Sequence, residues 1–129
     1  MLDVVVKNTE RFLLSVPKTK RKKYGQFFTN MSTAKFMASL FCFDRSKPCL
    51  EILDAGAGTG ILATAVIQKL IDDGYKGRIH VTCYETDDFV MPVLEENMRL
   101  STVLPNVTCS IKTDNYITSQ NFSTYTLFG

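Results

Sequence analysis

Three alternating glycines constrain the fold of this chain more than any other feature of its sequence. Residues 51–66 read EILDAGAGTGILATAV: an apolar segment stops at Asp54, then Gly56, Gly58 and Gly60 follow before the chain turns apolar again. Glycine accepts positive φ and lets a ligand lie against bare backbone. The stretch therefore predicts a tight turn from a strand into a helix, with exposed N–H groups and a nucleotide or nucleoside as ligand, rather than an ordinary connection.

The segments around this turn alternate between strand-like and helix-like patterns. We expect strands at residues 49–55, 78–85 and 106–113, and helices at residues 61–74 and 87–100. Gly74 closes the first of these helices, and Pro92 is tolerable only near the start of the second. This alternation predicts an α/β fold with a parallel sheet, in which ligands bind at the carboxyl ends of the strands. Those ends are residues 54–60, 85–87 and 114–116.

The N-terminal part is organised differently. We expect a helix at residues 2–15, a basic loop with aromatic residues at 18–30, and a second helix at 32–43. Pro17 ends the first helix, and Ser32 or Thr33 is the expected N-cap of the second. The chain therefore divides into an N-terminal helical segment, residues 1–48, and a Rossmann-like core, residues 49–129.

Composition excludes several classes of protein. The formal net charge of +2 is too small for the whole surface to bind a polyanion, so any basic function must be local. The single histidine, His80, has a strand pattern around it and no neighbour at metal-ligand spacing, so no metal is expected. We found neither a signal-peptide pattern nor an apolar run of about 20 residues, and expect a cytoplasmic protein with no membrane partner. The cysteines form no CxxC pair and are interpreted as reduced core residues: Cys42, Cys49, Cys83 and Cys109.

The residues next to the glycines discriminate between nucleotides. A P-loop would need Gly-Lys-Ser/Thr where Gly60 is followed by Ile61, which disfavours ATP and GTP. The dinucleotide fingerprint would need glycine at position 61, which weakens NAD. The carboxylate of Asp54 would repel a pyrophosphate and suits a ligand with a cationic amino group. S-adenosyl-L-methionine (AdoMet), which carries an ammonium and a sulfonium, fits this pattern.

Further acids follow the second expected strand. Glu85 could accept hydrogen bonds from both hydroxyls of a ribose, which we favour over a solvated acid because it lies one strand-helix-strand unit after the glycines. Asp87 and Asp88 are expected to cap the next helix.

Three stretches together resemble the N-terminal half of the adenine-specific (N6) DNA methyltransferases of restriction-modification systems. YGQFFTN followed by TAKFMASLF is similar to the opening AdoMet motif of that family, ILDAGAGTG to its glycine motif and CYETD to its ribose motif. They occur in the family's order over about residues 21 to 100. The resemblance implies a partial Rossmann-like methyltransferase fold, a site-specific adenine methyltransferase as the full-length enzyme, and AdoMet as cofactor. DNA, and a restriction or specificity subunit, are the implied partners.

The resemblance also implies roles for individual residues. The opening motif would wrap the methionine end of AdoMet, with Thr29 on its carboxylate, while Asn30 replaces the family's usual proline. After the third strand, either Asp114, or Asn115 with Tyr116 as the aromatic, would contact the adenine, and the choice between them stays open. The expected cofactor-binding residues are Tyr24, Gly25, Gln26, Phe27, Thr29, Asp54, Ala55, Gly56, Gly58, Glu85, Thr86, Asp114, Asn115 and Tyr116.

The family's catalytic Asn-Pro-Pro-Tyr motif is absent from these 129 residues, so no catalytic residue is assigned. Residues 123–129 could begin a fourth strand, and we expect the natural protein to continue. The chain then represents an AdoMet-binding fragment that is inactive alone. The alternatives are a non-catalytic AdoMet- or nucleotide-binding module, a small-molecule methyltransferase and an NAD oxidoreductase.

The basic run KTKRKK supplies five cations within six residues, enough for a local phosphate contact. A solvated loop is the interpretation that we favour for it from the sequence.

Overall fold

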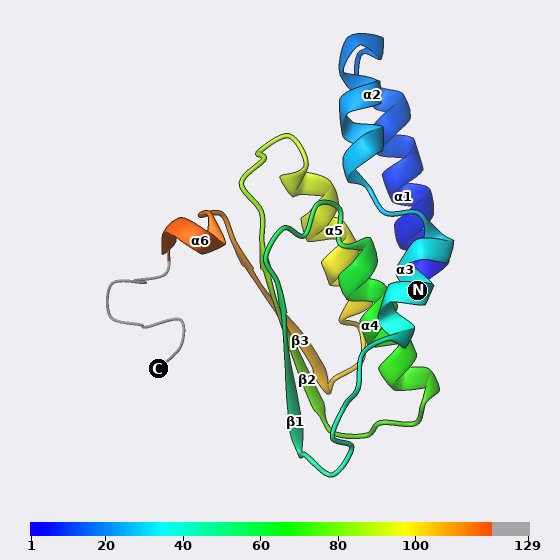
Figure 1. Cartoon of the computed structure of the whole chain (residues 1–129), viewed down its shortest axis with the longest axis vertical. Helices are drawn as coiled ribbons and strands as arrows, with labels where there is room; N and C mark the ends of the chain where they lie inside the picture. Colours follow the sequence, from blue (N-terminus) through cyan, green and yellow to red (C-terminus); the bar gives the residue numbers. More distant parts are fainter. Residues whose placement is uncertain (120–129) are drawn as a thin grey trace.

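The computed structural model describes residues 1–119, apart from the side chains of residues 25–27, 118 and 119. Its centre is a parallel sheet of three strands in the order β1-β2-β3 (Figure 1). The strands are β1 (Cys49–Asp54), β2 (Arg78–Tyr84) and β3 (Val107–Lys112). The helices α4 (Ile61–Asp72) and α5 (Met91–Ser101) connect them. The predicted strands, their parallel arrangement and the α/β class are therefore confirmed.

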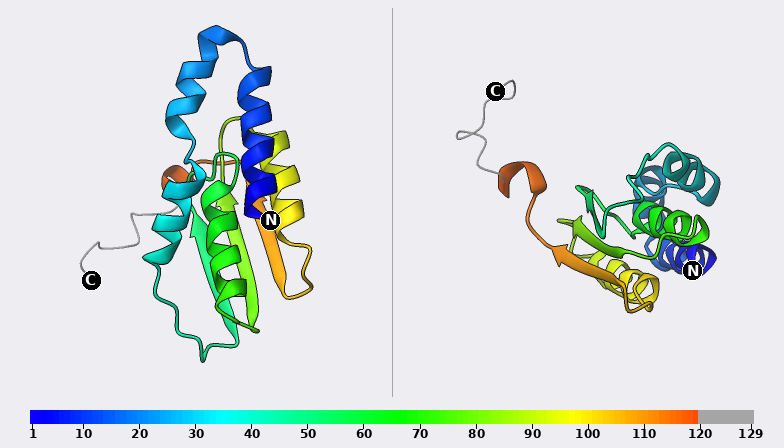
Figure 2. Two further views of the ribbon diagram at one scale, coloured as in Figure 1. Left: turned by 90° about the vertical axis from the view of Figure 1, so that its right-hand side faces the viewer. Right: turned by 90° about the horizontal axis from the view of Figure 1, so that it is seen from below.

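The two faces of the sheet have different surroundings. Every second residue of β2, namely Ile79, Val81 and Cys83, points from one face of the sheet into a core, and α4 and α5 cover this core. His80 points to the other face, in register between Glu51 of β1 and Thr108 of β3. Within residues 1–119, all long helices lie on the face of the sheet that carries Ile79, Val81 and Cys83 (Figure 2).

The N-terminal helices pack against this core. Helix α1 (Leu2–Ser15) packs on α4 and α5, and α3 (Met31–Ser39) packs on α4. Between them, α2 (Lys18–Phe27) forms a hairpin with α1 whose tip rises beyond the carboxyl ends of the strands (Figure 1). Figure 2 shows the same projection from a second direction.

The prediction of a basic loop at residues 18–30 was wrong, because most of it is α2. Lysine and arginine are good helix formers, and tertiary contacts hold this helix on α1. The Arg21 guanidinium donates to the carbonyl of Leu13 at 3.2 Å, at the C-terminal end of α1. The Tyr24 ring packs edge-on against Phe12 with 5.6 Å between ring centroids.

Three predicted helix boundaries also need correction. The N-cap of α3 is Asn30, whose side chain accepts from the backbone N–H of Thr33 at 2.8 Å; neither Ser32 nor Thr33 is the cap. That helix ends at Ser39, and Cys42, predicted to be a core residue, is exposed.

Helix α5 starts later than predicted. It begins at Met91, so Pro92 lies in the first turn, where its missing N–H costs little. Asp87 does not cap this helix; it accepts from the N–H of Phe89 at 2.9 Å within the preceding turn. Asp88 is exposed. The expected fourth strand at residues 123–129 lies outside the described residues.

No helix within the described residues 1–119 is both long enough and apolar enough to cross a bilayer.

Candidate cofactor site

The glycine turn lies at the carboxyl ends of β1 and β2, between the last residue of β1 and the first turn of α4. The N–H of Ala57 donates to the carbonyl of Tyr84 at 2.9 Å, which joins the turn to the end of β2. The N–H of Gly60 donates to the carbonyl of Ala57 at 2.8 Å and closes the turn. Asp54 and Glu85, at the ends of neighbouring strands, therefore flank one loop.

The three glycines differ in how far the protein around them requires a glycine. Gly60 has φ of +87°, and a Cβ there would lie 3.0 Å from Sδ of Met98. Gly58 has φ of +57°, and its Cβ would lie 3.4 Å from the ring of Phe28. Gly56 has no positive φ, and a Cβ there would meet no atom within 4 Å. The protein itself thus gives no reason for a glycine at position 56, whereas a ligand lying on the backbone would.

The N–H groups of the three glycines and of Ala57 donate hydrogen bonds within the protein, which corrects the expectation that these groups are exposed. The N–H of Gly58 donates to Oε1 of Glu85 at 2.7 Å, and that of Gly56 to Oδ1 of Asp54 at 3.3 Å. The other carboxylate oxygen of Glu85 accepts from Thr86 at 3.0 Å and from Asp87 at 2.9 Å. The turn is therefore a backbone cradle for two carboxylates, unlike a loop whose N–H groups point at a phosphate.

Asp54 is an unfavourable place for a negative charge. Burial of its carboxyl raises the pKa above the ordinary value of 3.8, and the charge of Glu85 raises it further, while the hydrogen bond from Gly56 opposes both effects. A cation bound beside Asp54 would reverse this balance.

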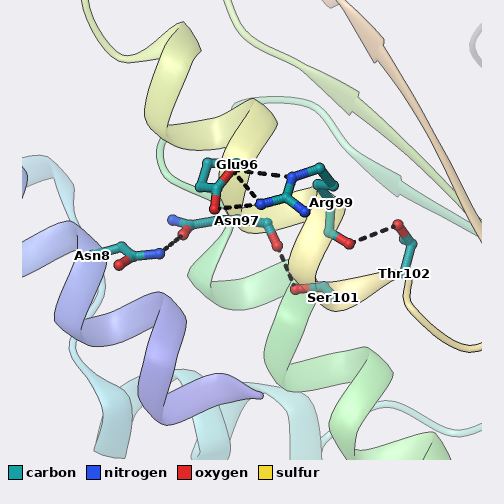
Figure 3. Close-up of polar contacts among 6 residues, drawn as sticks. All are labelled: Asn8, Glu96, Asn97, Arg99, Ser101 and Thr102. Carbon is teal, nitrogen blue, oxygen red and sulfur yellow. Dashed lines mark hydrogen bonds and ion pairs between the residues drawn. The ribbon is translucent and has the colours of Figure 1, made fainter.

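A network of buried polar side chains from α1 and α5 holds the glycine turn in place. The carbonyl of Thr59 accepts from the side-chain amide of Asn97 at 2.8 Å, and its hydroxyl bonds to the hydroxyl of Thr9 at 2.8 Å. Asn97 also accepts from Asn8 of α1 at 2.9 Å, as Figure 3 shows, and its own carbonyl accepts from Ser101 at 2.8 Å. Both Asn97 and Thr59 are fully buried. The network joins α1, α5 and the turn, and sequence patterns gave no sign of it.

A small cavity of about 70 Å³ opens on the turn. Its lining residues are Phe28, Thr29, Asp54, Gly56, Ala57, Gly58, Thr59, Ile61 and Leu62, of which Asp54 alone is charged. A larger cavity of about 430 Å³ between α1 and the start of α3 shares Phe28, Thr29 and Ile61 with it. The structure thus brings Thr29 of the opening motif to the glycine turn. Phe28, which the sequence interpretation passed over, lines both cavities.

Tyr24 lies elsewhere. Its ring is buried among Phe12, Phe28 and Phe89, in an aromatic cluster between α1, α2 and the segment after β2. Burial raises the pKa of its hydroxyl, and so does a hydrogen bond with Asp87. Tyr24 is not among the described residues that line the two cavities, and its contact with a cofactor stays a prediction. Gly25, Gln26 and Phe27 belong to the last turns of α2, and their side chains are outside the description.

The remaining expected residues lie along the same edge of the sheet. Ala55 and Thr86 are exposed beside Asp54 and Glu85. Asp114 is exposed after β3, and Oδ1 of Asn115 accepts from Ile117 at 2.9 Å at the start of α6 (Tyr116–Ser119). The Tyr116 ring packs edge-on against Tyr84, with 5.1 Å between centroids, and so lies next to the strand end that carries Glu85. The choice between Asp114 and Asn115 stays open.

Comparisons with known proteins point to methyltransferases. The chain is 33% identical over 115 residues to Type II methyltransferase M.BsuBI of Bacillus subtilis, which covers 88% of this chain and 23% of that protein. It is 38% identical over 77 residues to Type II methyltransferase M.PstI of Providencia stuartii, covering 60% of this chain and 15% of the relative. The chain therefore spans less than a quarter of the length of these relatives.

A comparison with solved structures finds a similar fold in a methyltransferase. A crystal structure of a candidate O-methyltransferase from Klebsiella pneumoniae superposes with a TM-score of 0.52 at 23% identity, over 86% of this chain and 42% of that one. No protein-family model matches the chain. The fold is a partial Rossmann-like methyltransferase fold, and the matches confirm the resemblance of this chain to methyltransferases of restriction-modification systems.

Proposed function

We propose that this chain binds AdoMet at the glycine turn, as the cofactor-binding part of an adenine-specific DNA methyltransferase. One observation carries the proposal: the N–H groups of Gly56 and Gly58 are bonded to the carboxylates of Asp54 and Glu85. A turn of this kind presents negative charge and carboxylate acceptors to its ligand. AdoMet offers an ammonium, a sulfonium and two ribose hydroxyls, all of which suit such a surface, whereas the phosphates of ATP or NAD would be repelled.

The residues present fit the cofactor in three respects. Gly56 leaves the backbone bare where a ligand would lie, and Asp54 lies beside it as a partner for the ammonium. Glu85, fixed by three backbone donors, would hold the ribose hydroxyls. Thr29, which lines the same cavity, would contact the carboxylate of the methionine end. When bound, AdoMet supplies the methyl group for transfer.

The division into residues 1–48 and 49–129 is part of this proposal. The first part would contribute the Phe28–Thr29 wall of the site, and the second the turn and its carboxylates. DNA as the substrate, adenine as the methylated base and the lack of activity of this chain alone rest on the resemblance to the DNA methyltransferases. A non-catalytic AdoMet-binding module is the second candidate, because these 129 residues contain no Asn-Pro-Pro-aromatic run.

The variant Gly56→Ala tests the site. A Cβ at this position meets nothing in the protein, so the free energy of unfolding should change by less than about 1 kcal/mol. The methyl group would occupy the place of the ligand, so AdoMet should bind at least about tenfold more weakly, a loss of roughly 1.4 kcal/mol. Calorimetric titration with AdoMet, NAD and ATP measures the affinities, and urea denaturation measures the stability.

Gly74→Ala is the matched control, because Gly74 closes α4 with φ of +83° far from the turn. It should lower stability and leave AdoMet affinity unchanged. Binding of NAD without binding of AdoMet, or equal AdoMet affinity in the wild type and Gly56→Ala, would contradict the proposal.

A further inference from the structure

Positive charge is concentrated in one segment of the chain. Residues 11–43 hold seven basic residues and no acidic one, whereas the other residues hold eight basic and thirteen acidic ones. The small net charge of the whole chain therefore conceals a strongly basic segment, and that segment contains the end of α1 and all of α2.

Four lysines of α2 form what we call the α2 lysine surface: Lys18, Lys20, Lys22 and Lys23. All four are exposed, and no carboxylate of the described residues pairs with them. The ammonium of Lys20 lies 5.8 Å above the ring centre of Phe89. Arg21 does not belong to this surface, because its guanidinium is bonded to carbonyls at the end of α1.

This arrangement is unfavourable for the helix on its own. Lys18 and Lys22 are like charges four residues apart, which destabilises a helix by a few tenths of a kcal/mol. Lys18, Lys20 and Arg21 also lie in the first turn, which has no acidic residue, where the helix dipole disfavours cations. A bound polyanion would offset both effects.

The hairpin lies beside the candidate cofactor site. Its tip rises past the carboxyl ends of the strands (Figures 1 and 2). Lys20 and Tyr24 contact Phe89, four residues after Glu85. An anionic polymer bound to the α2 lysine surface would therefore run next to the edge where the cofactor is proposed to bind.

We propose that the α2 lysine surface binds the phosphate backbone of duplex DNA beside the cofactor site. This inference rests on the proposed function, which makes DNA the substrate. Residues 18 to 23 extend over about 8 Å of helix, a length over which duplex DNA carries about five phosphate charges. An anionic membrane fits less well, because a membrane-surface helix needs a free apolar face, and the ring of Tyr24 is packed against Phe12.

The test compares two variants that lose the same charge. The first is Lys18→Gln/Lys22→Gln/Lys23→Gln. The second, Lys47→Gln/Lys76→Gln/Arg78→Gln, changes three exposed cations at the amino ends of the strands. Fluorescence anisotropy measures the binding of each protein to a labelled unmethylated duplex over a series of salt concentrations. The slope of log K against log salt should flatten by up to about 2.7 in the first variant and stay unchanged in the second.

Equal flattening in both variants would mean that net charge alone acts, and no flattening in either would mean that α2 does not contact DNA; each overturns the inference. Circular dichroism checks that both variants fold. Vesicles containing phosphatidylserine form a separate arm, and loss of vesicle binding without loss of DNA binding in the first variant would also overturn it.

Titration with AdoMet separates this inference from the proposed function. Retained AdoMet binding with an unchanged salt slope rejects the α2 surface alone, and α2-dependent DNA binding without AdoMet binding rejects the cofactor site alone.

Discussion

At the scale of single residues, Asp54 and Glu85 are linked because both accept hydrogen bonds from N–H groups of the glycine turn. Burial and the charge of Glu85 raise the pKa of Asp54, so the folded, ligand-free chain binds a proton at Asp54 more readily than the unfolded chain does. The stabilisation from this protonation is complete below the ordinary pKa of 3.8 and is lost as the pH rises through the raised pKa. Ionised Asp54 therefore destabilises the ligand-free protein at neutral pH.

The variant Asp54→Asn tests this charge. It keeps an oxygen that can accept from the N–H of Gly56 and removes the repulsion with Glu85, so the ligand-free protein should be more stable at neutral pH than the wild type. AdoMet binding should weaken by roughly 1.5–3 kcal/mol through loss of a charge-assisted contact. In the wild type, AdoMet affinity should fall as the pH falls through the raised pKa of Asp54, and binding at that pH should release protons. Calorimetry in two buffers of different ionisation enthalpy measures this release, and equal release by Asp54→Asn would contradict the assignment.

At the scale of elements, the glycine turn depends on helices that are distant in sequence. Asn97 of α5 and Thr9 of α1 both bond to Thr59, so the position of the turn depends on how these helices pack. No described side-chain polar atom that is fully buried lacks a hydrogen-bond partner, and removing one member would leave another unsatisfied.

We expect Asn97→Ala to lower the free energy of unfolding by about 1–3 kcal/mol, because the buried carbonyl of Thr59 would lose its side-chain donor. The control Asn8→Ala removes only the partly buried bond to Asn97 and should cost about 0.5–1.5 kcal/mol. Urea denaturation gives both values. A smaller cost for Asn97→Ala than for Asn8→Ala would mean that the turn is held by its own backbone bonds.

The sequence predicted the elements whose signals are local. The strands and α4 and α5 follow from periodicity, and the turn follows from its glycines. Helix α2 was missed because its packing depends on Arg21 and Tyr24 meeting α1. The direction of the turn's N–H groups was missed for a similar reason, since Glu85 lies 27 residues after its partner Gly58.

At the scale of the whole molecule, two regions of opposite charge lie at one end of the sheet. Asp54, Glu85 and Asp87 follow the strands, and the α2 lysine surface projects beyond them. In the proposed function the acidic region holds a cationic cofactor and the basic region a polyanionic substrate. The basic region would repel the cationic groups of AdoMet, and the acidic region would repel DNA phosphates and so keep them off the glycine turn.

Binding both ligands does not suffice for methyl transfer, and we expect this chain of 129 residues to bind AdoMet without methylating DNA. A base must leave the duplex to reach the cofactor, which costs a few kcal/mol and is offset by a pocket that stacks on the base and orients its amino group. No Asn-Pro-Pro-aromatic run is present to form such a pocket. Positioning contributes up to about 7–11 kcal/mol in favourable cases, so a bound cofactor beside an unheld base should give no measurable turnover. Tritium transfer from labelled AdoMet to unmethylated DNA measures this, with an active DNA adenine methyltransferase as the positive control. Transfer by the wild type that Gly56→Ala abolishes would show that these residues contain a catalytic apparatus of another kind.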